Sequence, residues 1–207
     1  ALGGRARPGH RQATPAMELA LQQRLVARLA SDREFREKFF ADPARVAASE
    51  GLTVAAEALA QIHHEQLRQL ARVLRRRRLA QAGIQLPLTR KALGPRFADL
   101  FRNYAVRPPP GKQPFEDALG FAAFLDQHAS TQGIDPQWAR SIARYEAARL
   151  EATWLRRRLL VRCFPHAIKQ LSALLTAGEV PPGSYQRSTT AVWWRTAASS
   201  RLKHWLG

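Results

Sequence analysis

The chain has 207 residues, of which 45% are hydrophobic, so it can bury a core and is not a wholly disordered protein. Its 33 Lys and Arg against 16 Asp and Glu give a net charge of +17, which predicts an acidic partner such as nucleic acid, an anionic surface, or an acidic protein or peptide. A single cysteine excludes an internal disulfide, and the short apolar runs favour a soluble cytoplasmic protein that makes no membrane contact.

We expect residues 1–16 to be an extension or a tag outside the fold. They lack the apolar core of a signal peptide. Met17 is the only methionine and opens the first helical pattern. A predicted N-terminal helical region therefore covers residues 17–106.

Within that region, residues 31–52 predict two short helices in direct succession. Ser31 and Glu34 have the spacing of a capping box, in which each side chain satisfies the backbone N–H of the other residue. Asp42 is a predicted cap for the second helix. Pro43 suits its first turn, where no N–H donor is needed.

Four consecutive arginines follow the next helical pattern, and we expect them to close that helix, where the helix dipole favours cations. They are Arg75, Arg76, Arg77 and Arg78. Residues 68–112 contain twelve Lys or Arg and a single acid, Asp99. Three interpretations stay open for the cluster: a solvated helix end, a docking surface for an acidic partner, or a clamp on nucleic acid.

The remaining helices are separated by turn signals. Residues 83–89 are predicted to break the helical pattern, and Gly94 with Pro95 starts another helix. A proline-rich connection leads to a second helical region over residues 115–156. In it, Tyr145 is expected to lie in the core, and Glu146 is expected to pair with an arginine.

Residues 157–207 predict a small α/β unit. Strands are expected at residues 159–164, 189–196 and 201–206, with a helix at 165–177. About fifty residues bury too little surface to be stable alone, so we expect the unit to pack on the helices. The predicted fold is mainly α: an N-terminal helical body with a small C-terminal β-α-β-β unit packed on it.

The chain shows no constellation of catalytic residues. It has no glycine-rich phosphate loop, no paired cysteines and no Glu-x-x-His pair, and adjacent histidines such as His63 and His64 point in different directions on a helix. Cys163 lies in an apolar run and is expected to be a buried thiol. We therefore expect no enzymatic activity, no metal site and no cofactor in this chain.

The last two strands are the predicted peptide-binding site. Trp193 and Trp194 are consecutive, so in a strand they face opposite ways. We expect at least one of them in the core, and burial of both stays open. An exposed tryptophan near an open edge suits capture of an extended peptide by strand addition. The predicted peptide-binding residues are Trp193, Trp194, Arg195, Arg201, Lys203 and Trp205.

Several weak motifs occur together in a characteristic order. They are LASDREFREKFFADPARVAASEGL, LRQLARVLRRRRL, LPLTRKALGPRFADLFRNYA, DALGFAAFLDQ and ARYEAARLEATW. In this order, over residues 25–154, the chain resembles the companion proteins, or fused companion domains, of multinuclear non-haem iron-dependent oxidative enzymes. Those enzymes modify ribosomally made peptides, and part of the wider companion group is catalogued as DNA-binding domains.

The resemblance implies an accessory subunit. Its partner would be a barrel-fold iron oxidase that holds the iron, and its ligand a precursor peptide with an acidic leader. Arg75, Arg76, Arg77 and Arg78 would then dock the partner. The alternatives are a DNA- or RNA-binding regulator, supported by the charge, and a structural domain fused to an enzyme.

Overall fold

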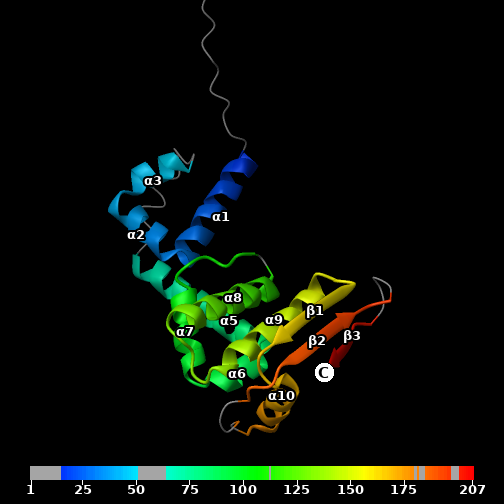
Figure 1. Ribbon diagram of the computed structural model, residues 1–207. Coiled ribbons are helices and arrows are strands. Elements are labelled where there is room, and N and C mark those ends of the chain that lie inside the picture. The colour runs from blue at the N-terminus through cyan, green and yellow to red at the C-terminus, as the bar shows by residue number, and fades with distance from the viewer. Residues whose placement is uncertain (1–14, 51–63, 112, 180, 182–184, 197–200) are drawn as a thin grey trace, which may run out of the picture. The chain divides into compact units, whose positions relative to one another are not determined.

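The structure is a computed structural model that describes residues 15–50, 64–111, 113–179, 181, 185–196 and 201–207 (Figure 1). The chain divides into two compact units, residues 1–71 and residues 72–207, and each unit is described by itself. Among the described residues, no helix is long and apolar enough to cross a membrane.

Three helices form most of the first unit: α1 (Pro15–Ser31), α2 (Arg33–Ala41) and α3 (Pro43–Ser49). The predicted capping box of Ser31 and Glu34 at the start of α2 is wrong. Helix α1 continues to Ser31, whose hydroxyl donates to the Ala27 carbonyl, and Asp32 caps α2 by accepting from the Phe35 N–H at 3.0 Å. Glu34 instead pairs with Lys38. Ser31 cannot act as the cap because it is the last helical residue of α1.

The second predicted cap is confirmed. Asp42 accepts from the Arg45 N–H at 3.0 Å, and Pro43 occupies the first turn of α3. The apolar faces of these helices meet in one small cluster. Its buried members are Leu25, Leu29, Phe35, Phe39, Ala47 and Leu67. The last two residues of the predicted pair of helices, Gly51 and Leu52, lie outside the described residues.

Helix α5 (His64–Gln85) corrects the predicted helix end at the four arginines and the predicted break that follows it. The helix does not close at Arg78 but continues to Gln85, and Ala82 beyond the arginines is buried in the core. Residues 83–89 contain only a brief break, after which α6 (Pro87–Leu93) begins. Pro87 at the first turn suits this start.

The core of the second unit lies between helices α7 (Arg96–Tyr104), α8 (Pro114–Thr131) and α9 (Trp138–Trp154). Aromatic rings of α7 and α8 contact edge to face: Phe121 lies 5.2 Å from Phe97 and 5.0 Å from Phe101, centroid to centroid. Helix α9 faces this core with Trp138, Ile142 and Tyr145, which are all buried, so the expected core position of Tyr145 is confirmed.

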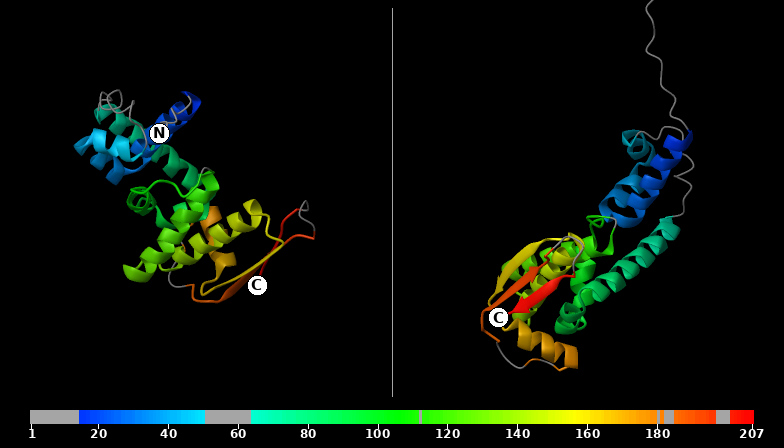
Figure 2. Two further views of the ribbon diagram at one scale, coloured as in Figure 1. Left: turned by 90° about the horizontal axis from the view of Figure 1, so that it is seen from above. Right: turned by 90° about the vertical axis from the view of Figure 1, so that its right-hand side faces the viewer.

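The predicted β-α-β-β unit is confirmed. Strand β1 (Leu159–Phe164) leads into α10 (Ile168–Ala177), followed by β2 (Thr189–Trp194) and β3 (Lys203–Leu206). The strands form an antiparallel sheet in the order β1-β2-β3, on one side of α9 (Figures 1 and 2). The chain is therefore mainly helical, with a small three-stranded sheet and a helix near its C-terminus, as predicted.

Candidate peptide-binding face

The inner face of the sheet is a core surface. Trp193 is 1% exposed, and its ring lies 5.7 Å from that of Tyr145 on α9 and 5.0 Å from that of His204 on β3. Leu160 and Phe164 of β1 are buried on the same side. Trp193, a predicted peptide-binding residue, therefore belongs to the core and offers no surface to a peptide. Burial lowers the pKa of His204, and so does the charge of Arg149.

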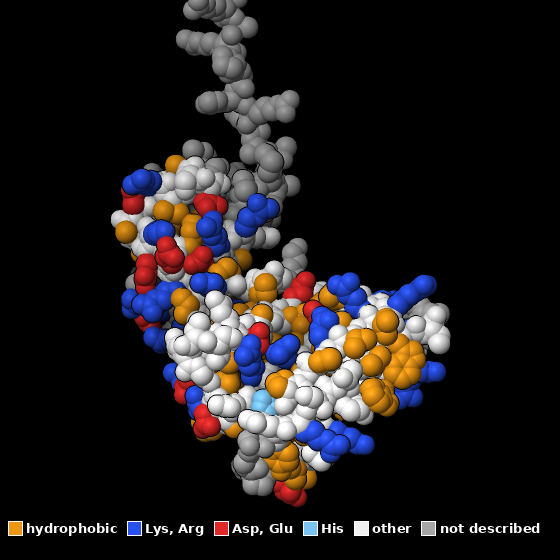
Figure 3. All heavy atoms as spheres, viewed as in Figure 1, with side chains coloured by type: hydrophobic (Ala, Val, Ile, Leu, Met, Phe, Trp, Pro, Cys, Tyr) orange, Lys and Arg blue, Asp and Glu red, His pale blue; other side chains and the backbone are white. Residues whose placement is uncertain are grey.

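The other side of the sheet, which we call the outer face, is apolar and open. The strand register places side chains there in three rows: Leu159, Trp194 and Lys203; Val161, Val192 and Trp205; and Cys163 with Thr190. Leu159 is 63% exposed and Trp205 53% exposed, whereas Trp194 is half-buried. Figure 3 shows hydrophobic side chains over the sheet, with Lys and Arg side chains beside them.

Cys163 lies on this outer face, so the prediction of a buried thiol is wrong. Strand alternation is the reason: Phe164 points into the core, and its neighbour must point away from it. The thiol contacts the Thr190 hydroxyl at 3.7 Å across the strands.

Strand β3 forms one edge of the sheet. Gly207 and Thr190 exchange reciprocal backbone hydrogen bonds of 3.0 Å, which fixes the alternation along the pair. The N–H groups of Gly207 and Trp205 therefore point to β2, and those of Leu206 and His204 point to the free side. No strand pairs with that side among the described residues.

A cleft of about 510 Å³ lies beside this edge. Its walls come from α10, from the chain entering β2, and from the end of β3. The lining residues are Ala167, Lys169, Gln170, Ala173, Arg187, Ser188, Thr189, Leu206 and Gly207. The free edge thus has an apolar face on one side and a cleft with Lys169 and Arg187 near the other.

The three predicted cations of this site have different roles. Arg201 and Lys203 are exposed. Arg195 instead donates from its guanidinium to the carbonyls of Ala152 and Thr153, at 3.3 and 3.2 Å, in the last turn of α9. A cation suits the carbonyl end of a helix, so Arg195 has a structural role.

The four consecutive arginines also separate. Arg78 forms a bidentate ion pair with Asp117, with both contacts at 2.9 Å, and both side chains are nearly buried. Arg77 is exposed, and Arg75 and Arg76 line a pocket against α7. Burial, and then the Asp117 charge, raise the pKa of Tyr104, whose hydroxyl donates to the Asp117 carboxylate.

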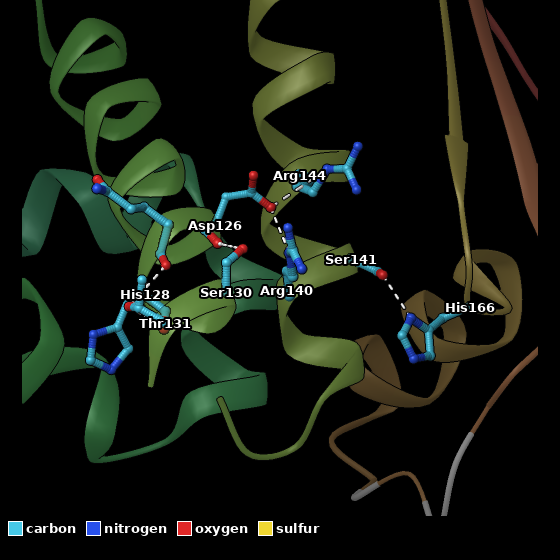
Figure 4. A network of polar contacts seen from close by, with 9 residues as sticks. Asp126, His128, Ser130, Thr131, Arg140, Ser141, Arg144 and His166 are labelled. Carbon is cyan, nitrogen blue, oxygen red and sulfur yellow. Dashed lines mark hydrogen bonds and ion pairs between the residues drawn. The ribbon is translucent and has the colours of Figure 1, made fainter. Parts of the chain in front are cut away.

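One polar pair resembles part of a catalytic site. Ser141 Oγ lies 2.7 Å from His166 Nδ1, and burial lowers the pKa of His166. Ser141 is 2% exposed, however, and Asp126 pairs with Arg140 and Arg144 rather than with the histidine (Figure 4). A substrate cannot reach this serine, so the contact serves to hold the start of α10 against α9.

Metal-ligating side chains do not gather in the part of the chain that the structure describes, which contains no group of three or more His, Cys, Asp or Glu able to hold an ion. His63 and the side chain of His64 lie outside it.

The comparison with known families covers part of the chain. Residues 50–127 match the family model described as SCO6045-like, C-terminal domain. No curated protein and no solved structure matches the chain significantly. The matched stretch ends within α8, before the sheet, so the candidate peptide-binding face lies outside it.

Proposed function

We propose that this chain is a non-catalytic accessory subunit that binds a precursor peptide and presents it to a partner multinuclear iron-dependent oxidase. The single observation that supports peptide binding most is the free edge of β3, between the apolar outer face and the cleft beside α10. The order of the motifs over residues 25–154 supports the choice of partner. The iron belongs to that partner, and this chain contributes no cofactor.

The proposed mode is strand addition. An extended peptide would accept hydrogen bonds from the backbone N–H groups of His204 and Leu206 on the free side of β3. Its side chains would alternate between the outer face, beside Trp205, and the cleft beside α10. Arg201, Lys203 and Lys169 would attract acidic residues of a leader and speed its association.

A backbone-level experiment tests this mode. Peptides would be selected from a displayed random library on the full chain, and amide exchange would then be followed by NMR with and without the best peptide. We expect the His204 and Leu206 amides to become protected on binding, whereas the Trp205 amide is already bonded to β2 and changes little. Protection confined to α5 and α7, with none on β3, would place the peptide elsewhere and contradict the proposal.

The alternative function is a DNA- or RNA-binding regulator, which the charge of +17 favours. Charge alone predicts weak, strongly salt-dependent binding, with a Kd of about a micromolar or weaker at physiological salt. Sequence-specific binding at nanomolar affinity would support the regulator and overturn the accessory subunit.

A further inference from the structure

The cleft beside α10 lies where one side chain of an added strand would point. Leu206 lines this cleft and pairs with the buried Ala191, so its side chain is on the inner side of the sheet. Residues that lie directly opposite each other in neighbouring strands project to the same side. A peptide residue opposite Leu206 would therefore point into the cleft, whereas the residues before and after it would point to the outer face.

The walls of the cleft combine apolar surface with two cations. On the apolar side, Leu206 is half-buried and Ala173 of α10 is exposed, so both offer surface to a ligand. Lys169 lies one turn before Ala173 on the same face of α10, and Arg187 comes from the chain that enters β2. Both cations are exposed, and neither forms an ion pair with a residue that the structure describes.

The surrounding unit supplies almost no negative charge for these cations. Residues 157–207 contain eight Lys or Arg and a single acid, Glu179, which lies after the end of α10 and does not line the cleft. The local field is therefore positive, and it complements an acidic side chain of a ligand.

We propose that the cleft binds one glutamate side chain of the added peptide, at the position opposite Leu206. The methylene groups of this glutamate pack on Leu206 and Ala173, and its carboxylate meets Lys169 and Arg187. Hydrogen bonds between charged groups are roughly twice as strong as those between neutral ones. This glutamate site rests on the proposed function, and it adds one fixed acidic residue to what a bound peptide must contain.

Glutamate suits the cleft better than an apolar residue or a phosphate group does. A wholly apolar side chain would cover Leu206 and Ala173, but it would take water from Lys169 and Arg187 without replacing it by an anion, which costs free energy. The phosphate backbone of a nucleic acid would meet the two cations and leave the apolar walls uncovered. A glutamate side chain, with an apolar stem and a charged end, meets both requirements.

The two sides of β3 offer matched variants for the test. Lys169 and Arg187 line the cleft, whereas Lys203 lies on the outer face and Arg201 precedes it in the chain. All four are exposed, and none forms an ion pair with a described residue. The cleft variant, Lys169→Gln with Arg187→Gln, and the control variant, Arg201→Gln with Lys203→Gln, therefore remove the same charge. Exposed charges contribute little to stability, so both variants should fold.

The probe is the displayed library of random short peptides, selected on the unaltered chain. We expect the selected peptides to share a glutamate at one position, and its replacement by glutamine to weaken binding about tenfold. The same replacement should cost less than about twofold in the cleft variant, because the partners of the carboxylate are gone. In the control variant the full loss should remain. These four affinities form a double-mutant cycle, measured by isothermal titration.

A shared apolar residue in place of the glutamate, or an equal loss in the two variants, would overturn the glutamate site. The proposed function would still stand if such peptides protect the His204 and Leu206 amides. Absence of that protection for every selected peptide would overturn both proposals. Oligothymidylate serves as the nucleic-acid probe: binding that is lost in the cleft variant alone would assign the two cations to a phosphate backbone instead.

Discussion

Glu146, in the middle of α9, accepts hydrogen bonds from both the backbone N–H and the hydroxyl of Thr89, at 2.8 and 2.7 Å. Its other carboxylate oxygen accepts from the Leu88 N–H at 2.9 Å. These N–H groups lie in the first turn of α6, where a helix has no internal acceptors. The expected pairing of Glu146 with an arginine is therefore wrong, and this buried carboxylate joins α6 to α9 instead.

Replacing Glu146 by alanine should destabilise the protein strongly. The change leaves two backbone donors without acceptors beside a buried position, and each costs about 1–3 kcal/mol. We expect a loss of about 3 kcal/mol in the free energy of unfolding, measured by urea denaturation. Glu151→Ala, on the same helix, removes a half-exposed partner of Arg162 and should cost less than about 1 kcal/mol. Similar costs for the two variants would contradict the capping role.

The same residue gives the stability a pH dependence. Burial raises the pKa of Glu146 above its ordinary value of 4.5, although its hydrogen bonds act in the opposite direction. A raised carboxyl pKa contributes stability that is complete below the unfolded pKa and is lost as the pH rises through the folded one. Compared with Glu146→Gln, the unaltered chain should therefore lose stability as the pH rises above 4.5. The urea denaturation midpoints of both proteins across this pH range measure this loss of stability. A parallel pH dependence in the two proteins would exclude the effect of Glu146.

The four arginines should differ sharply in their contribution to stability. Arg78→Ala leaves the nearly buried Asp117 without its cation, and breaking a buried pair in this way costs about 3–5 kcal/mol. Arg77→Ala removes an exposed side chain and should cost less than about 0.5 kcal/mol. Thermal unfolding of both variants measures the difference. An Arg78 variant as stable as the Arg77 variant would mean that the ion pair has no structural role.

Local sequence patterns predicted the parts of the fold that depend on near neighbours. Asp42 with Pro43 and the strand at residues 159–164 are of this kind. Bonds between distant positions could not be predicted, because periodicity says nothing about remote partners. Glu146 and Thr89 are 57 residues apart. Residues 83–89 were predicted as a break because the sequence does not show that Glu146 binds the first turn of α6.

The candidate site was predictable to a similar extent. Alternation in a strand indicated that Trp193 and Trp194 face opposite ways, and the sheet confirms it. Which one enters the core depends on the position of α9, which no local pattern gives. The role of Arg195 depends equally on a remote helix end. The sequence therefore identified the region of the candidate site, and the structure separates its core residues from its exposed ones.

Gly120→Ala should destabilise the protein, although replacing a glycine by alanine within a helix normally favours the helix. A Cβ at Gly120 would collide with the Tyr104 hydroxyl and approach Pro110 at 3.1 Å. That hydroxyl is held by Asp117, so it cannot move freely. The gain in helix propensity, about 1 kcal/mol, is smaller than the usual cost of overpacking, about 1–3 kcal/mol.

Gly83→Ala is the matched control for this change. A Cβ there meets the side chain of Arg90 at 3.0 Å, and this exposed chain can move aside. We expect Gly83→Ala to be neutral or slightly stabilising, and Gly120→Ala to lower the melting temperature. A melting temperature that rises in both variants would show that Tyr104 is free to shift.

Trp205→Ser should separate peptide binding from folding. Trp205 is 53% exposed on the outer face, its ring lies over Gly207, and its backbone is already bonded to β2. Removing the ring should therefore leave the melting temperature almost unchanged. Binding of the selected peptides should weaken about tenfold or more, because exposed tryptophans at an interface are common anchors.

Trp154→Ser is the control, since Trp154 is 54% exposed but stacks on Phe115 outside this face. Isothermal titration of both variants decides the matter: equal affinities would show that the outer face takes no part in peptide binding, whereas a loss confined to the Trp205 variant would support strand addition at β3.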